Sequence, residues 1–154
     1  MTNKKEIGLA VIGCGTIGRI RAMMAKDYPG ISWIGLCDIN EELGKKLQID
    51  CEADFFTTDY NELVKRSEVN AVIIATDENH HYGPIMASLE REISLFIEKP
   101  LATDLEESRD VLNKIKSTNV DAVLGYTQRF RRRFLAVKQK LMDQKIGHVT
   151  SVVT

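Results

Sequence analysis

Ile7-Gly-Leu-Ala-Val-Ile-Gly-Cys-Gly-Thr-Ile-Gly18 is the most informative stretch of this 154-residue chain. The predicted strand Glu6–Ile12 is an apolar run, and Gly13-x-Gly15-x-x-Gly18 follows it directly at the start of a predicted helix. In that setting the first glycine permits a tight turn, the second lets a pyrophosphate approach the backbone, and the third allows close helix–strand packing. The pattern predicts a dinucleotide-binding βαβ unit, and the alternative is a glycine-rich turn without a ligand.

Strand-like and helix-like segments alternate along the chain after this motif. Further strands are predicted at Ile31–Cys37, Asp54–Thr57, Ala71–Ala75, Ser94–Ile97 and Ala122–Gly125. Helices are predicted at Ile17–Tyr28, Glu41–Ile49, Asp59–Ser67, His81–Arg91 and Asp104–Ser117. Six strands and five crossovers predict an α/β fold with a doubly wound parallel sheet. Thr103-Asp-Leu-Glu106 has the pattern of a capping box with Thr103 as the helix N-cap.

The last thirty residues depart from this alternation. Apolar residues at helical spacing predict a helix over Gln128–Asp143, and the valine-rich segment Ile146–Thr154 predicts a strand. We interpret residues 1–124 as a dinucleotide-binding domain and residues 125–154 as the crossover helix and first strand of a second α/β domain that is otherwise absent from the sequence. Because an unpaired strand tends to pair between chains, we expect a homo-oligomer.

Composition excludes several classes of partner. The chain has 21 basic and 22 acidic residues, so no excess charge favours nucleic acid or an anionic membrane surface. Its first apolar run is too short for a signal peptide or a membrane span, so we expect a cytoplasmic protein. Three cysteines without CxxC spacing predict buried free thiols, and the adjacent His80 and His81 do not suggest a metal site.

Asp38 ends the second predicted strand, twenty residues after Gly18. This spacing suits a carboxylate that accepts hydrogen bonds from an adenosine ribose. The same carboxylate would repel a 2′-phosphate, and residues 39–42 contain no arginine to bind one. NAD is therefore expected as the cofactor, with NADP disfavoured. The alternative role for Asp38 is a helix N-cap or a loop residue.

Glu98-Lys99-Pro100 follows the fifth predicted strand, at the sheet edge where doubly wound folds bind their ligands. A lysine ammonium at this edge can polarise a substrate hydroxyl or carbonyl, and burial readily tunes a lysine for proton transfer. Lys99 is therefore the candidate catalytic residue. The alternative is a surface ion pair in a strand-to-helix loop.

Together these segments resemble the N-terminal half of the Gfo/Idh/MocA oxidoreductases, the group of glucose–fructose oxidoreductase and inositol dehydrogenase. The matching stretches are Ala10–Gly18, Asp38, Ala75–His81, Glu98–Ala102 and Gly125–Phe130. The glycine motif is common to dinucleotide binders, whereas Glu-Lys-Pro followed by Leu-Ala is more specific to this family. The resemblance implies a Rossmann domain followed by a second α/β domain that holds the substrate and often mediates oligomerisation.

The resemblance also implies a role for each matching residue. The implied pyrophosphate site consists of Gly13, Gly15, Thr16, Ile17 and Gly18. Asp38 would bind the adenosine ribose, Thr76 and His81 would lie beside the nicotinamide, and Glu98 would position the cofactor's ribose or ring. Lys99 would contact the reacting oxygen of a sugar, cyclitol or related polyol, and Arg129 would be interdomain or purely structural. We expect this chain alone to bind cofactor without turnover.

Two departures from the family qualify this interpretation. Asp77-Glu78 stands where the family usually has Pro-Asn, and the family's catalytic Asp-x-x-x-His pair belongs to the absent second domain. Asp77 and His81 match that spacing, but they follow the fourth strand of the first domain, so we interpret the match as a coincidence. The alternative functions are a non-catalytic NAD(H)-sensing module that acts through protein contacts, and an S-adenosylmethionine methyltransferase, against which Glu-Lys-Pro argues.

Overall fold

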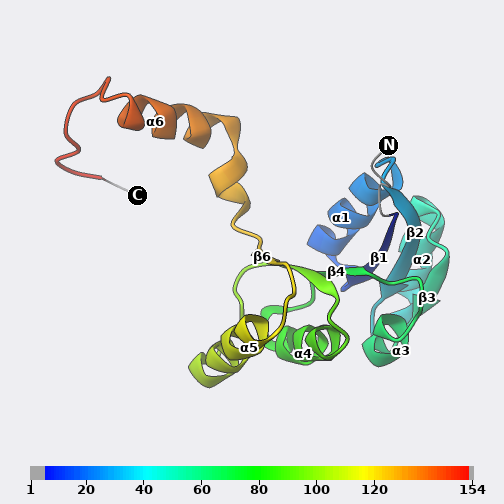
Figure 1. Ribbon diagram of the computed structural model, residues 1–154. Helices are drawn as coiled ribbons and strands as arrows, with labels where there is room; N and C mark the ends of the chain where they lie inside the picture. The colour runs from blue at the N-terminus through cyan, green and yellow to red at the C-terminus, as the bar shows by residue number, and fades with distance from the viewer. Residues whose placement is uncertain (1–5, 153–154) are drawn as a thin grey trace, which may run out of the picture.

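The computed structural model describes residues 6–152, and within them six parallel strands form one sheet in the order β3-β2-β1-β4-β5-β6 (Figure 1). The strands are β1 Ile7–Ile12, β2 Ile31–Cys37, β3 Phe55–Thr57, β4 Ala71–Ile74, β5 Ser94–Ile97 and β6 Ala122–Leu124. The chain builds outward from β1 in one direction to β3, and then in the other direction from β4 to β6. This arrangement confirms the doubly wound parallel sheet predicted from the sequence.

Helices connect the strands at every predicted crossover. They are α1 Thr16–Lys26, α2 Glu41–Cys51, α3 Tyr60–Val64, α4 Tyr82–Glu90 and α5 Leu105–Ser117, with α6 Arg132–Met142 after the sheet. The described residues also contain two 3₁₀ turns, η1 Glu78–His80 and η2 Thr127–Phe130. The third helix is shorter than predicted, because it ends at Val64 rather than at Ser67.

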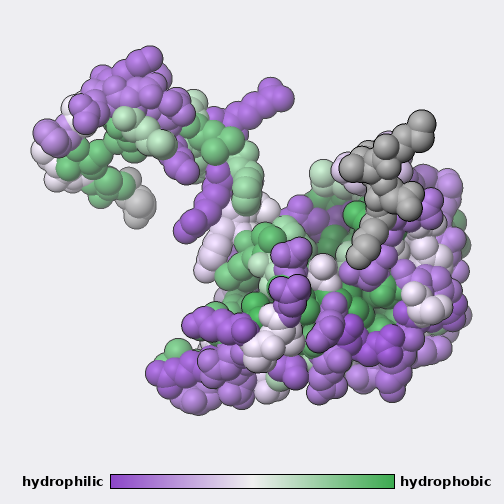
Figure 2. Space-filling view, in the orientation of Figure 1, coloured by the Kyte–Doolittle hydropathy of each residue, from purple (hydrophilic) through white to green (hydrophobic). Residues whose placement is uncertain are grey.

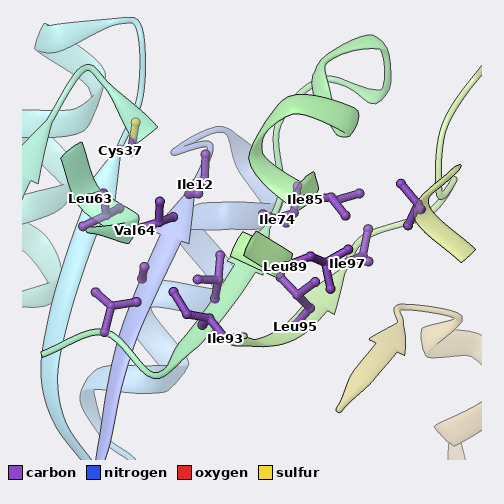
Figure 3. Close-up of a cluster of buried hydrophobic side chains, with 14 residues drawn as sticks. Ile12, Cys37, Leu63, Val64, Ile74, Ile85, Leu89, Ile93, Leu95 and Ile97 are labelled. Carbon is purple, nitrogen blue, oxygen red and sulfur yellow. The ribbon is translucent and has the colours of Figure 1, made fainter. Parts of the chain in front are cut away.

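Apolar side chains cover both faces of the sheet, as expected for strands that are hydrophobic without alternation. On one face, α3, α4 and α5 pack against β1, β4 and β5, and Ile12, Leu63 and Leu89 are among the buried residues (Figure 3). On the other face, α1 and α2 pack against β1 and β2 through residues such as Ala22 and Leu36. Each buried aliphatic side chain of this size contributes about 1.5–3 kcal/mol to folding.

The second face is covered only in part. A groove of about 530 Å³ lies beside α1 over β1, β4, β5 and β6, with Ile73, Phe96 and Val123 in its lining. Parallel crossovers are right-handed, so the two connections that run from β4 to β6 place α4 and α5 on the opposite face. The topology itself therefore leaves this part of the sheet without a helix.

The last helix, α6, lies apart from the sheet (Figure 1) and has no buried residue. Phe134 and Val137 are exposed, and Figure 2 shows hydrophobic residues along one side of this segment. The prediction of a strand at 146–154 is wrong for residues 146–152, which form no strand, and residues 153–154 lie outside the described part. Valine-rich sequence does not form a strand unless a neighbouring strand supplies hydrogen-bonding partners.

The N-cap of α5 is Asp104, one residue after the predicted cap at Thr103. One carboxylate oxygen of Asp104 accepts the backbone N–H of Glu106 at 2.8 Å and that of Glu107 at 3.0 Å. The Thr103 hydroxyl instead lies 3.3 Å from the side-chain oxygen of Asn79. A carboxylate is a good cap here because its charge also interacts favourably with the helix dipole.

Replacing the two candidate caps separately tests this assignment. Asp104→Ala should lower the free energy of unfolding by about 1 kcal/mol, because two N–H groups lose their acceptor. Thr103→Ala is the matched control and should cost clearly less, since it removes one exposed contact. Urea denaturation of both variants gives the comparison, and a larger loss for Thr103→Ala would contradict the assignment.

Candidate functional site

A pocket of about 950 Å³ lies at the carboxyl ends of the central strands. Backbone hydrogen bonds continue the sheet one residue beyond those strands, from Gly13 N–H to the Cys37 carbonyl at 2.8 Å and from Glu98 N–H to the Ile74 carbonyl at 2.9 Å. The loops after β1, β2, β4 and β5 therefore meet around one cavity. Most of the residues selected from the sequence line it, namely Gly13, Gly15, Thr16, Ile17, Asp38, Thr76, Glu98 and Lys99.

The three glycines of the turn occupy positions with different structural requirements. Gly13 has φ +96°, and a Cβ there would lie 2.4 Å from the Ala75 carbonyl oxygen. A Cβ on Gly18 would lie 1.7 Å from the Gly13 carbonyl oxygen, so this glycine permits close packing behind the pocket. A Cβ on Gly15 would meet nothing within 4 Å. Only Gly15 therefore leaves open space above the start of α1.

The N-terminus of α1 differs from those of α2 and α5. Its N-cap residue is Gly15, no side chain caps it, and its first turn contains no acidic residue. By contrast, Asn40 caps α2 and Asp104 caps α5, and both helices have glutamates in the first turn. The α1 terminus therefore presents unsatisfied N–H groups and the positive end of its dipole to the pocket, an arrangement that favours an anion.

Backbone groups hold the Asp38 carboxylate in the pocket wall. One oxygen accepts the Cys14 N–H at 2.6 Å, and the other accepts the Asn40 N–H at 2.8 Å. Each oxygen retains acceptor capacity for a ligand hydroxyl. The alternative role of helix N-cap belongs to Asn40, whose side chain accepts the Leu43 N–H at 3.0 Å.

Thr76 places a polar atom without a partner in the same wall. Its hydroxyl oxygen is buried and makes no hydrogen bond within the described residues. An unsatisfied buried hydroxyl costs about 1–3 kcal/mol. A ligand that exchanged a hydrogen bond with Thr76 would remove this cost, so the atom is an indication of a polar ligand in the pocket.

His81 lies beneath this wall rather than in it. The side chain is 1% exposed, with Nδ1 2.7 Å from the Pro100 carbonyl oxygen and Nε2 3.3 Å from the Thr76 carbonyl oxygen. Both ring nitrogens therefore lie within hydrogen-bonding distance of a backbone carbonyl oxygen, and a ring nitrogen that carries a proton donates to it. His81 thus joins the loop after β4 to the loop after β5 without lining the pocket itself, and its contact with the cofactor stays a prediction.

Glu98 is paired with Arg21, a residue that the sequence analysis did not select. Arg21 Nε and Nη2 lie 2.9 and 2.5 Å from the same Glu98 oxygen, and the guanidinium lies over the Phe96 ring at 5.0 Å from its centroid. The Glu98 side chain is only 12% exposed. The sequence signal is a charged residue one turn after Gly18, on a helix whose buried residues, Gly18, Ala22 and Ala25, are all small.

Lys99 is exposed at the pocket mouth. Within residues 6–152 its ammonium forms no ion pair, and Glu98, its neighbour in sequence, is bound to Arg21. The surface ion pair considered as an alternative is therefore not formed between these two residues. The Lys99 ammonium remains available to an oxygen of a bound molecule.

Asp77, Glu78 and His80 form the lip of the pocket beside Thr76. One Asp77 oxygen accepts the Asn79 N–H at 3.1 Å and the Asn79 side-chain amide at 2.9 Å. These two hydrogen bonds lower the pKa of Asp77 below its ordinary value. Asp77 bonds to its own turn while His81 bonds to backbone carbonyls, so the two do not hydrogen-bond to each other.

The cysteines offer no thiolate to this site. Cys14, Cys37 and Cys51 are buried free thiols, as predicted. Burial raises the pKa of the Cys14 and Cys37 thiols to about 12, so neither is a thiolate at neutral pH. In the part of the chain that the structure describes, no group of three metal-ligating side chains occurs and no helix is long and apolar enough to cross a membrane.

Comparison with known proteins identifies a family. Residues 7–126 match the Gfo/Idh/MocA model, described as an oxidoreductase family with an NAD-binding Rossmann fold. The scyllo-inositol 2-dehydrogenase (NAD(+)) of Bacillus subtilis is 27% identical over 92% of this chain and 42% of its own length. The myo-inositol 2-dehydrogenase of Thermotoga maritima is 26% identical over 95% of this chain and 44% of its own length.

Solved structures agree on the fold. The scyllo-inositol dehydrogenase of Lactobacillus casei with bound NAD(H) and scyllo-inositol superposes with a TM-score of 0.89 at 23% identity, over 95% of this chain and 44% of that one. A probable dehydrogenase from Thermotoga maritima gives a TM-score of 0.85 at 26% identity, over 92% and 42% of the two chains. The chain thus spans about two fifths of the length of the relatives that it matches.

Alanine substitutions at Gly15 and Gly18 test the geometry of the turn. Gly18→Ala should lower the free energy of unfolding by roughly 1–3 kcal/mol, because its Cβ collides with the Gly13 carbonyl. Gly15→Ala should leave stability within about 0.5 kcal/mol, since the added methyl meets open space. Thermal and urea unfolding give both values, and equal losses in the two variants would contradict the geometry described here.

Proposed function

This chain belongs to the Gfo/Idh/MocA oxidoreductase family, with its NAD-binding Rossmann fold at residues 7–126, and we propose that it is the cofactor-binding part of an NAD-dependent dehydrogenase acting on CH–OH groups. One observation carries the proposal. An uncapped helix N-terminus, a carboxylate held by backbone N–H groups and a threonine with a buried, unpartnered hydroxyl all line one cavity at the carboxyl ends of parallel strands.

These residues fit a dinucleotide. The open space above Gly15 admits a pyrophosphate close to the backbone, where the N–H groups of α1 bind its charge. Asp38, at the end of β2, accepts hydrogen bonds from the adenosine ribose. Thr76, at the end of β4, provides a hydroxyl for the other half of the molecule. A dinucleotide would therefore be held by residues at the ends of β1, β2 and β4.

The remaining polar residues organise the reacting end. When bound, the nicotinamide accepts or supplies the hydride. Lys99 would donate a hydrogen bond to the substrate oxygen and stabilise the charge that develops there, while the proton would pass to the Asp-x-x-x-His pair that the resemblance places in the second domain. Glu98, held by Arg21, orients the cofactor from the floor of the pocket. His81 fixes the loops that carry Thr76 and Lys99 relative to each other.

The substrate we propose is a neutral polyhydroxylated molecule, such as a cyclitol, a sugar or a related polyol. The support is the named activity of relatives on inositols, two of which are cited above.

We further propose that the chain self-associates, because α6 has an apolar side with no buried residue and the sheet beside α1 has an uncovered apolar groove. No observation favours the NAD(H)-sensing or methyltransferase alternatives.

Cofactor preference tests the role of Asp38. NADH should bind at least about 10-fold more tightly than NADPH, because the 2′-phosphate would meet the Asp38 carboxylate. Asp38→Ala should narrow this difference by weakening NADH binding and relieving the repulsion of NADPH. Isothermal titration measures the dissociation constants of both nucleotides, and equal or tighter binding of NADPH to the unmodified chain would rule out the assignment.

This chain should bind the cofactor without catalysing substrate oxidation. We expect NADH to bind with a fluorescence change while NAD-dependent oxidation of a panel of cyclitols and sugars stays at background. Correct substrate orientation lowers the barrier by roughly 7–11 kcal/mol. An acid–base partner raises the rate by a further factor of about 10² to 10⁴. Lys99 alone supplies neither contribution. Lys99→Ala should leave NADH affinity unchanged. Robust turnover that Lys99→Ala abolishes would show instead that the chain holds a complete catalytic site.

A further inference from the structure

The order of the strands fixes which end of the pocket receives each half of a dinucleotide. Asp38 follows β2, the glycine turn follows β1, and Thr76 follows β4. Neighbouring strands are about 4.8 Å apart, so Asp38 and Thr76 lie on opposite sides of the α1 N-terminus. If the adenosine ribose binds Asp38, the nicotinamide must extend to the ends of β4 and β5. The loop after β4 is therefore the wall nearest the nicotinamide.

That loop contributes two adjacent carboxylates to the pocket lip, Asp77 and Glu78. Asp77 is 64% exposed, and its hydrogen bonds to Asn79 hold it in place through one oxygen. Within residues 6–152 its second oxygen and the Glu78 carboxylate have no hydrogen-bonding or ion-pair partner. The unpartnered Thr76 hydroxyl immediately before them independently indicates that this wall faces a ligand.

The other charged groups around this end do not cancel the two carboxylates. Glu98 is neutralised by its ion pair with Arg21, which leaves the Lys99 ammonium as the free cation among the described residues that line this end. His80 Nδ1 lies 3.7 Å from the Asp77 oxygen that also accepts from Asn79. Apart from His80, this end carries the two carboxylates against the one ammonium of Lys99.

We propose that Asp77 and Glu78 make this site discriminate between the redox states of its cofactor, in favour of the oxidised dinucleotide. The inference rests on the proposed function. The nicotinamide ring of NAD⁺ carries a positive charge that the ring of NADH lacks, while the rest of the two molecules is identical. Carboxylates beside the ring attract it only in the oxidised state. Those beside the adenosine half act on both states alike.

The expected size of the effect follows from the exposure of the two side chains. Charges in contact with water and within about one Debye length of each other interact weakly, so two of them should change the affinity ratio by about 3-fold at low salt. The effect should shrink towards unity as salt approaches about 0.5 M. The quantity to measure is the ratio of the NAD⁺ dissociation constant to the NADH dissociation constant.

The test compares this ratio in the unmodified chain and in the double variant Asp77→Asn, Glu78→Gln, by isothermal titration at pH 8. Both substitutions keep size and shape, and asparagine retains an oxygen that can cap the turn. The ratio should rise about 3-fold in the double variant. Glu42→Gln is the matched control, because Glu42 is an exposed carboxylate in the first turn of α2, at the adenosine end. It should leave the ratio unchanged.

A second measurement covers the case in which the variant does not fold. In the unmodified chain, raising the salt from 20 mM to about 0.5 M should raise the same ratio by about 3-fold, because salt screens the attraction for NAD⁺. A ratio that neither salt nor the double substitution changes, with both nucleotides still bound, overturns the inference and leaves the proposed function intact. Failure of the unmodified chain to bind either nucleotide overturns both.

Discussion

The contact between the glycine turn and the start of α1 is the feature on which the whole site depends. Gly18 lies so close to the Gly13 carbonyl that no side chain fits between them, and a side chain on Gly13 would likewise collide with the backbone of Ala75. The turn is therefore held between the first helix and the fourth strand. This packing aims the α1 N-terminus over the strand ends and brings Thr76 to the other side of the same cavity. An anion site and its polar walls thus follow from the close packing of these two glycines.

Sequence reasoning succeeded where the signal was local. The alternation of strands and helices, the glycine motif and the position of Asp38 are all readable within short windows, because each reflects backbone geometry or a strand end. The Arg21–Glu98 pair joins residues 77 positions apart, and only the tertiary fold brings α1 close to the end of β5. The sequence analysis selected His81 but did not predict its burial, because a sequence does not show which carbonyl groups surround a side chain.

The error at residues 146–152 has a different physical origin. Strand formation depends on a partner strand more than on the residues themselves, and valines without such a partner gain little from extended pairing. The sheet gives the converse case, because its uncovered groove beside α1 is a consequence of crossover handedness and not of any local pattern. Both features show that apolar sequence predicts a need for burial without predicting where the covering surface comes from.

The ion pair between Arg21 and Glu98 serves folding and also affects which charged groups of the pocket are available to a ligand. A carboxylate as buried as Glu98 requires a cation, because an unpaired charge in that position would be strongly destabilising. Arg21 meets this need from α1, and it is held by the Phe96 ring as well as by the ion pair. Had Lys99 been the partner, its ammonium would have been committed to structure. Since Arg21 supplies the neutralising charge from α1, the ammonium of Lys99 at the pocket mouth stays unpaired within residues 6–152, beside the carboxylates of the loop after β4.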